Sequence, residues 1–187
     1  STQIGSLTTT QEAGLSSVEL SILSNSQLIG LTTTQIISLT STQSAGFTST
    51  QITSLTTTQF ASLMATQITG LSTDALIGLT STQINSLTTA QDSGLTSTQI
   101  FALAPTQISA LTTTSISLLT SSQIGNLSVA QFNSLTSTQI NSIQSNIVVN
   151  IQGSAAADSI NLVGVTTPVN VNLGINNASG GTLTSTS

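Results

Sequence analysis

The octad Leu79-Thr80-Ser81-Thr82-Gln83-Ile84-Asn85-Ser86 decides the fold of this 187-residue chain. An apolar residue recurs at its first position, every eight residues, from Leu7 to Ile143. A short fixed period is the signature of a repeat array in which each unit packs mainly on its neighbours. We therefore expect residues 1–143 to form an octad-repeat solenoid.

The middle of the octad carries a helix-start signal. With the apolar residue as position 1, position 2 is mostly Thr or Ser, and position 5 is Gln except at Glu19, Ala75 and Ser115. Thr followed three residues later by Gln is a capping box, and the apolar residues at positions 1 and 6 are placed as a hydrophobic staple. Pro105 falls at position 3, the first helical position, where proline is favoured. The octad therefore predicts a short helix.

One continuous helix does not fit the period, because eight residues advance the helix by about 800°, and the leucines would not form a stripe. The break is expected at position 8, which holds small residues suited to a corner or to close packing, including Gly46, Gly70, Gly78 and Gly94. The sequence thus predicts a tight coil of short helical octads, with positions 1 and 6 inward and the hydroxyl-rich positions outward. The number of octads per turn stays open.

A β-solenoid throughout is the alternative, because Thr favours strands and Thr-x-Thr recurs, as at Thr80 and Thr82. Positions 1 and 6 have opposite parity, so a regular strand would not point both inward. This disagreement, together with Gln at position 5 and Pro105, favours the helical interpretation.

Some octads depart from the pattern. Glu12, Ser44 and Asp92 occupy the inward position 6, and a buried unpaired carboxylate is expensive, so we expect these units to open a gap to solvent or to face a partner. Simple drift in a tolerant unit is the alternative. Bulky residues at position 7 are expected to pack against the next coil, or else to form a lateral apolar patch; they are Ile29, Ile37, Ile77 and Phe101.

The octad stops after Ile143. Residues 144–175 are β-rich, with strands expected in 146–151, 159–165 and 169–173, and they are predicted to be a short cap or assembly segment whose open edges could pair with another chain. Residues 176–187 resemble a Gly/Ser/Thr-rich tail or linker. Leu183-Thr184 also resembles the start of an octad, so the chain is either cut from a longer array or its ends continue successive subunits.

The composition excludes most chemistry. The chain has no Lys, Arg, His or Cys, and its five acids give a net charge of −5. General acid–base, zinc and calcium sites lack their usual groups, so we expect no enzyme, no catalytic, cofactor-binding or metal residues and no cofactor. Nucleic acid needs cationic partners and is not expected to bind. No apolar stretch is long enough for membrane insertion.

The Leu-Thr-x-x-Gln-Ile units resemble repeats of large secreted bacterial surface proteins of the adhesin or biofilm-matrix kind, over about three quarters of the chain. The resemblance implies an extracellular or cell-surface structural protein, either a repeat spacer of an adhesin or a subunit of a self-assembling filament. Its partners would be copies of itself or neighbouring repeats. The alternative is an ice- or polysaccharide-binding module that uses ranks of Thr.

Overall fold

The computed structural model describes residues 2–143, 148–152, 159–161, 170–174 and 182–184. Over the first of these ranges, eighteen helices of four to six residues follow one another at the octad period. They confirm the predicted helical repeat, and the alternative of a β-solenoid through the octads is wrong. The helices are α1 Thr2–Gly5, α2 Thr9–Ala13, α3 Ser17–Ser21, α4 Asn25–Ile29, α5 Thr33–Ser38, α6 Ser41–Ser44, α7 Ser49–Ser54, α8 Thr57–Ala61, α9 Ala65–Gly70, α10 Thr73–Ile77, α11 Ser81–Asn85, α12 Thr89–Gly94, α13 Ser97–Ala102, α14 Pro105–Ser109, α15 Thr113–Leu118, α16 Ser121–Gly125, α17 Val129–Asn133 and α18 Ser137–Ser142.

Most helices begin with the predicted capping box, whereas α10 and α15 keep only the N-cap hydroxyl bond because position 5 is Ala75 or Ser115. In α5, the Gln35 backbone N–H donates to Thr32 Oγ1 at 3.2 Å, and the Thr32 N–H donates to Gln35 Oε1 at 2.8 Å. The N-cap residue is in the extended region in every helix from α2 to α18. Met64 and Ala104 offer no side-chain acceptor, and there only the glutamine half of the box remains. Extended backbone at the N-cap therefore leads the chain into the next helix, and after several helices the residue before it is extended too, as Leu39 is before Thr40.

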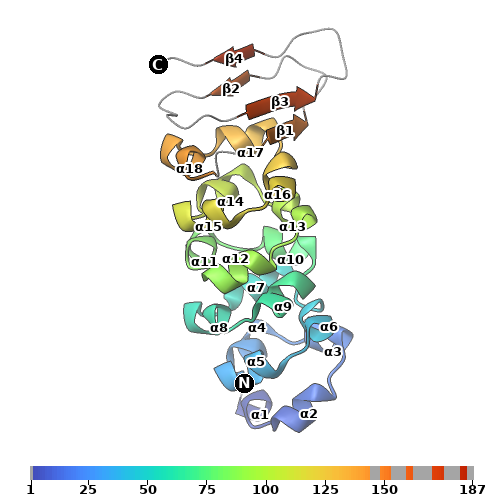
Figure 1. Ribbon diagram of the computed structural model, residues 1–187. Coiled ribbons are helices and arrows are strands. Elements are labelled where there is room, and N and C mark those ends of the chain that lie inside the picture. The colour runs from blue at the N-terminus through green and yellow to red at the C-terminus, as the bar shows by residue number, and fades with distance from the viewer. Residues whose placement is uncertain (1, 144–147, 153–158, 162–169, 175–181, 185–187) are drawn as a thin grey trace.

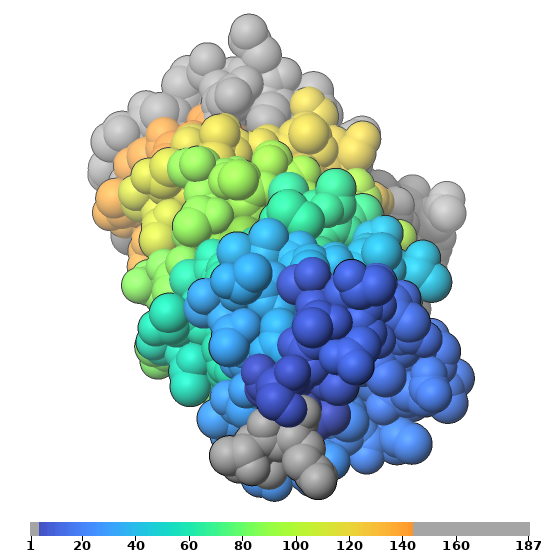
Figure 2. All heavy atoms as spheres, turned by 90° about the horizontal axis from the view of Figure 1, so that it is seen from below, coloured from blue at the N-terminus to red at the C-terminus, as the bar shows by residue number. Residues whose placement is uncertain are grey.

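Three octads make one turn of the coil. Helices that stack on each other lie three places apart in sequence, as in α4 on α1, α9 on α6 and α18 on α15. The solenoid therefore has three sides, which we call face 1 (α1, α4, α7, α10, α13 and α16), face 2 (α2, α5, α8, α11, α14 and α17) and face 3 (α3, α6, α9, α12, α15 and α18). Figure 1 shows these turns stacked into a rod, and Figure 2 shows the rod from its N-terminal end.

The core is a continuous apolar column inside this coil. From Leu20 to Ile143, the apolar residues at positions 1 and 6 are almost all buried. Nearer the N-terminus, Leu15 and Leu23 are only partly buried. Burial of two apolar side chains per octad is the main stabilising contribution, because a helix of five residues is far too short to be stable by itself.

Four glycines at position 8 serve close packing between turns, namely Gly46, Gly70, Gly78 and Gly94. Gly30 and Gly78 have φ of −71° and −73°, which any residue adopts, so no left-handed geometry is required there. A Cβ at Gly70 would lie 2.3 Å from the Ser41 carbonyl oxygen, and one at Gly94 would lie 2.4 Å from that of Ala65. Both carbonyls belong to the helix one turn earlier. Glycine is therefore needed where successive turns approach most closely.

Two expectations about unusual octads are wrong. Glu12 and Ser44 are fully buried and Asp92 is 3% exposed, so these units do not open a gap to solvent. The bulky residues at position 7 do not pack into the next coil, because Ile29, Ile37, Ile77 and Phe101 remain 44–57% exposed. Position 7 points away from the core whatever residue occupies it.

Beyond the helices, the described residues include four short strands, β1 Val148–Gln152, β2 Ser159–Asn161, β3 Asn170–Gly174 and β4 Thr182–Thr184. β1 pairs with β3 and β2 with β4, both in parallel. Paired residues are 22 apart in the first pair and 23 apart in the second, close to the helical turn of three octads. β1 contacts α16 and β2 contacts α17, so the strands continue the coil at the end of the rod (Figure 1). β4 includes Leu183 and Thr184, and the residues that would continue an octad after them lie outside the described residues.

Candidate functional site

The chain has no His, Cys, Lys or Arg, and within the described ranges no three acidic side chains come together in a way that could hold a metal ion. No helix among the described elements is long and apolar enough to span a membrane. Three features remain that could carry function. They are the glutamines at position 5, which we call the glutamine ladder, the three faces of the rod, and the buried acids Glu12 and Asp92.

The glutamines at position 5 link successive turns. The Gln99 amide nitrogen donates to the carbonyls of Ile68 and Leu71, both at 2.8 Å, while its oxygen accepts from the Thr96 N–H. Gln67 and Gln91 repeat this geometry, with bonds to carbonyls 31 and 28 residues earlier. Each such side chain starts its own helix and also caps the C-terminal end of the helix four places before it. These amides are buried, so the bonds are strong and costly to lose.

This second role of glutamine was not predicted from the sequence. The capping box explains the amide oxygen but leaves the amide nitrogen without a task. The signal that could have revealed it is the rarity of Glu at position 5, because Glu would satisfy the box equally well. Glu19 is the one exception, and its side chain is exposed.

A second row of bonds runs between turns at position 7. Thr69 Oγ1 donates to the carbonyl of Gly94 at 2.6 Å, and Asn85 Nδ2 donates to that of Ala110 at 3.3 Å. In both cases the acceptor lies at position 8 of the helix three places later. The turns are thus joined along their outer edges as well as through the buried glutamines.

The three faces differ in their exposed residues. On face 2, position 4 holds a threonine in five successive turns, all exposed: Thr10, Thr34, Thr58, Thr82 and Thr106. We call this the Thr column. The same position is interrupted by Asp74 on face 1 and by Val18 and Ala90 on face 3.

Face 1 carries the exposed apolar residues of position 7. Ile29, Ile77 and Phe101 lie there, with Thr53 in the turn between the two isoleucines, while Ile37 lies on face 2. The predicted lateral patch therefore exists only as a broken row on one face. Nothing in the described part of the chain covers it.

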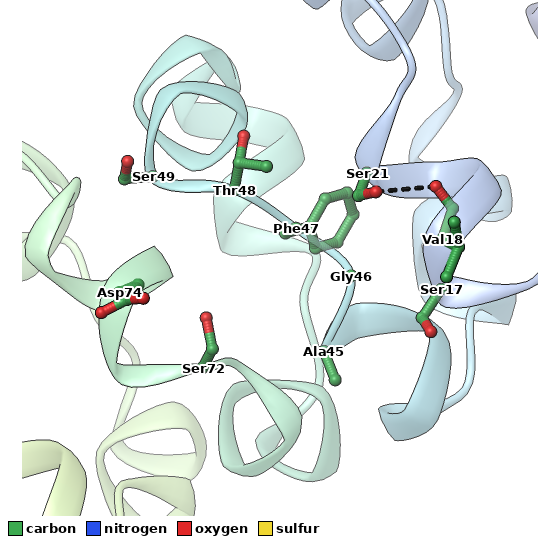
Figure 3. A pocket seen from close by; sticks show the side chains of 10 residues that line it. All are labelled: Ser17, Val18, Ser21, Ala45, Gly46, Phe47, Thr48, Ser49, Ser72 and Asp74. Carbon is green, nitrogen blue, oxygen red and sulfur yellow. Dashed lines mark hydrogen bonds between the residues drawn. The ribbon is translucent and has the colours of Figure 1, made fainter.

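Two shallow depressions lie on the surface, and only the second is lined by residues of this row. The first, of about 410 Å³, is lined by hydroxyl residues and Asp74 together with apolar residues that include Val18 and Phe47 (Figure 3). In it, Ser21 Oγ donates to the Val18 carbonyl at 2.7 Å. The second, of about 440 Å³, lies between Asn25, Thr53 and Ile77. Both are open, and one carboxylate among hydroxyls offers neither a metal site nor a general acid–base pair.

Glu12 and Asp92 are the only buried carboxyl groups in residues 4–143. Ser38 Oγ donates to Glu12 Oε2 at 3.0 Å, and Ser115 hydrogen-bonds to Asp92. Burial raises the pKa of both carboxyls, and the serine bonds offset only part of this effect. By contrast, bonds from the Ser16 backbone and hydroxyl lower the pKa of the exposed Glu19. Ser115 stands at position 5, so the octad that supplies this bond has no glutamine.

Comparison of the chain with protein-family models, curated proteins and solved structures finds no match to any of them.

Proposed function

We propose that this chain is a non-enzymatic extracellular structural protein, either a repeat spacer of a surface adhesin or a subunit of a self-assembling filament. The observation that carries the proposal is the glutamine ladder. It joins successive turns through buried bonds, and each octad that takes part uses a single glutamine side chain to do so. A rod extended in this way gains length without needing a larger core.

The surface supports the same proposal. It is rich in hydroxyl groups and has no cationic side chain, and in the described ranges no three acidic side chains come together. The absence of Lys and Arg also removes every trypsin cleavage site, which suits a polymer exposed outside the cell. We further propose that residues 144–175 are a cap or assembly segment, and that 176–187 include a tail. The contacts of β1 with α16 and of β2 with α17 support this assignment, because strands laid across the last turn would shield its apolar interior.

Negative-stain electron microscopy of the purified chain at rising concentration distinguishes the two forms of this proposal. Regular filaments would identify a self-assembling subunit, joined through chain ends or strand edges. Single short rods at every concentration would leave the spacer. Compact or irregular particles, with no rod, would contradict both.

A second candidate is an ice- or polysaccharide-binding module, and the Thr column is the observation that favours it. Five exposed threonines repeat once per turn on face 2 and on no other face without interruption. The test compares thermal hysteresis and polysaccharide pull-down for the wild type and for Thr34→Val/Thr58→Val/Thr82→Val.

The matched control is Thr42→Val/Thr66→Val/Thr114→Val, which changes the same position and the same residue type on face 3. Loss of binding in the face 2 variant alone would support the second candidate. No binding by the wild type, or equal loss in both variants, would contradict it.

A further inference from the structure

Position 6 is the most deeply buried position of the octad. It holds Ile, Leu or Phe in most units, and these side chains are almost completely inaccessible, as at Ile84 and Ile100 on either side of Asp92. Glu12 and Asp92 place a carboxyl group in this column. Each has one oxygen bonded to a serine from another turn, while Glu12 Oε1 and Asp92 Oδ1 are buried and have no hydrogen-bond partner.

The charge environment offers nothing to compensate a carboxylate at these sites. α2 packs against α5, and α12 packs against α9 and α15; none of these three neighbours contains a titratable side chain. No cationic side chain exists anywhere in the sequence. The other acidic residue near α2 is Glu19 in α3, whose exposed carboxylate is bonded to Ser16. Burial in the apolar core therefore favours the protonated, neutral form of these two carboxyl groups over the charged form.

We propose that Glu12 and Asp92 make the coil pH-sensitive, so that it is closed when their carboxyls are protonated and opens locally at α2 and α12 when they ionise. The sign follows from burial. A buried acid binds its proton more tightly in the folded state than in the unfolded state, so its contribution to stability is present at low pH. That contribution is lost as pH rises above the ordinary carboxyl value of about 4 and through the higher folded value.

The position of Asp92 makes the effect local. α12 is in the middle of the rod, and the octad above it supplies Ser115 in place of a glutamine. The amide bonds between turns are therefore fewer where the acid lies. In a coil whose turns contact only their neighbours, one weak turn can open while the others stay folded.

The test is the melting temperature, measured by circular dichroism from pH 3 to pH 9. We expect the wild type to melt at lower temperature as pH rises. Glu12→Leu/Asp92→Ile, which restores the usual apolar residue, should remove most of this dependence and raise the melting temperature at pH 8 by at least about 4 °C. The matched control is Glu19→Gln/Asp74→Asn, which removes two exposed charges and should keep the loss at high pH.

Parallel curves for the wild type and the apolar variant would overturn the proposal, as would an equal flattening by the control. If the apolar variant does not fold, amide hydrogen exchange tests local opening instead. The wild type and Asp92→Asn are compared with each other at pH 4 and, separately, at pH 8. We expect faster exchange around α12 and α15 in the wild type at pH 8 and no difference at pH 4. Equal exchange at both values would contradict local opening.

Discussion

At the scale of single residues, the fold depends on a repeated glutamine whose amide oxygen and amide nitrogen have different roles. The oxygen of each ladder glutamine fixes the start of its own helix, and its nitrogen fixes the turn below. The oxygen's role follows from the sequence, since its partner is three residues away. The nitrogen's role does not, because its acceptors are 28 and 31 residues away and depend on how many octads make a turn.

Gln99→Glu separates these two roles. A carboxylate can still accept from the Thr96 N–H, but it would face the carbonyls of Ile68 and Leu71 with no hydrogen to donate. We expect a loss of about 2–4 kcal/mol in the free energy of unfolding at pH 7, measured by urea denaturation. Gln11→Glu is the control, since Gln11 is exposed and makes no bond to an earlier turn in the described structure; it should change stability little.

Gly70→Ala tests the close approach of turns. The added Cβ would lie 2.3 Å from the Ser41 carbonyl oxygen, so two helices must separate. We expect the free energy of unfolding, measured by urea denaturation, to fall by about 1–3 kcal/mol. At Gly14 the only near atom is the Gln11 carbonyl oxygen at 3.3 Å, so Gly14→Ala should cost much less. Similar losses at both positions would indicate that backbone conformation, not space between turns, requires glycine.

At the scale of the helix, the start is encoded more strongly than anything else. The predicted capping box, the staple and Pro105 at the first helical position all agree with the structure. The expectation that the octads with Glu12 and Asp92 open a gap to solvent is wrong for a physical reason. It assumes an ionised carboxyl, whereas burial raises the pKa of both groups. The outward direction of the position 7 side chains also does not follow from the octad alone, because it depends on the angle between successive helices.

Ala104→Thr should strengthen a helix that has lost half of its cap. Ala104 provides no acceptor for the first turn of α14, although Gln107 still bonds its N–H at 2.9 Å. Restoring the hydroxyl should raise the free energy of unfolding by about 0.5–1 kcal/mol, and Thr96→Ala in α13 should lower it by about 1 kcal/mol. Thermal melts of the two variants should therefore shift in opposite directions, and a shift in the same direction would contradict this account of capping.

At the scale of the whole molecule, three octads per turn is the quantity that the sequence did not supply. Every octad predicts the same helix and the same corner, and small changes in corner dihedrals would give a coil with a different number of sides. The structure settles the number through the contacts between helices three places apart. It also gathers the threonines of face 2 into one column, which no inspection of single octads reveals.

Three octads per turn also govern how this chain can change length. Adding or deleting a single octad would leave every helix intact, yet it would rotate all that follows by about a third of a turn. The threonines beyond the junction would then continue a different side of the rod. Duplications of 24 residues preserve surface alignment, whereas duplications of 8 or 16 scramble it. Spin labels at Thr34→Cys and Thr106→Cys, in a chain without native cysteine, would report this rotation after deletion of one intervening octad. Recombination that adds or removes single repeats in such a gene would therefore move the surface residues beyond the junction from one side of the rod to another.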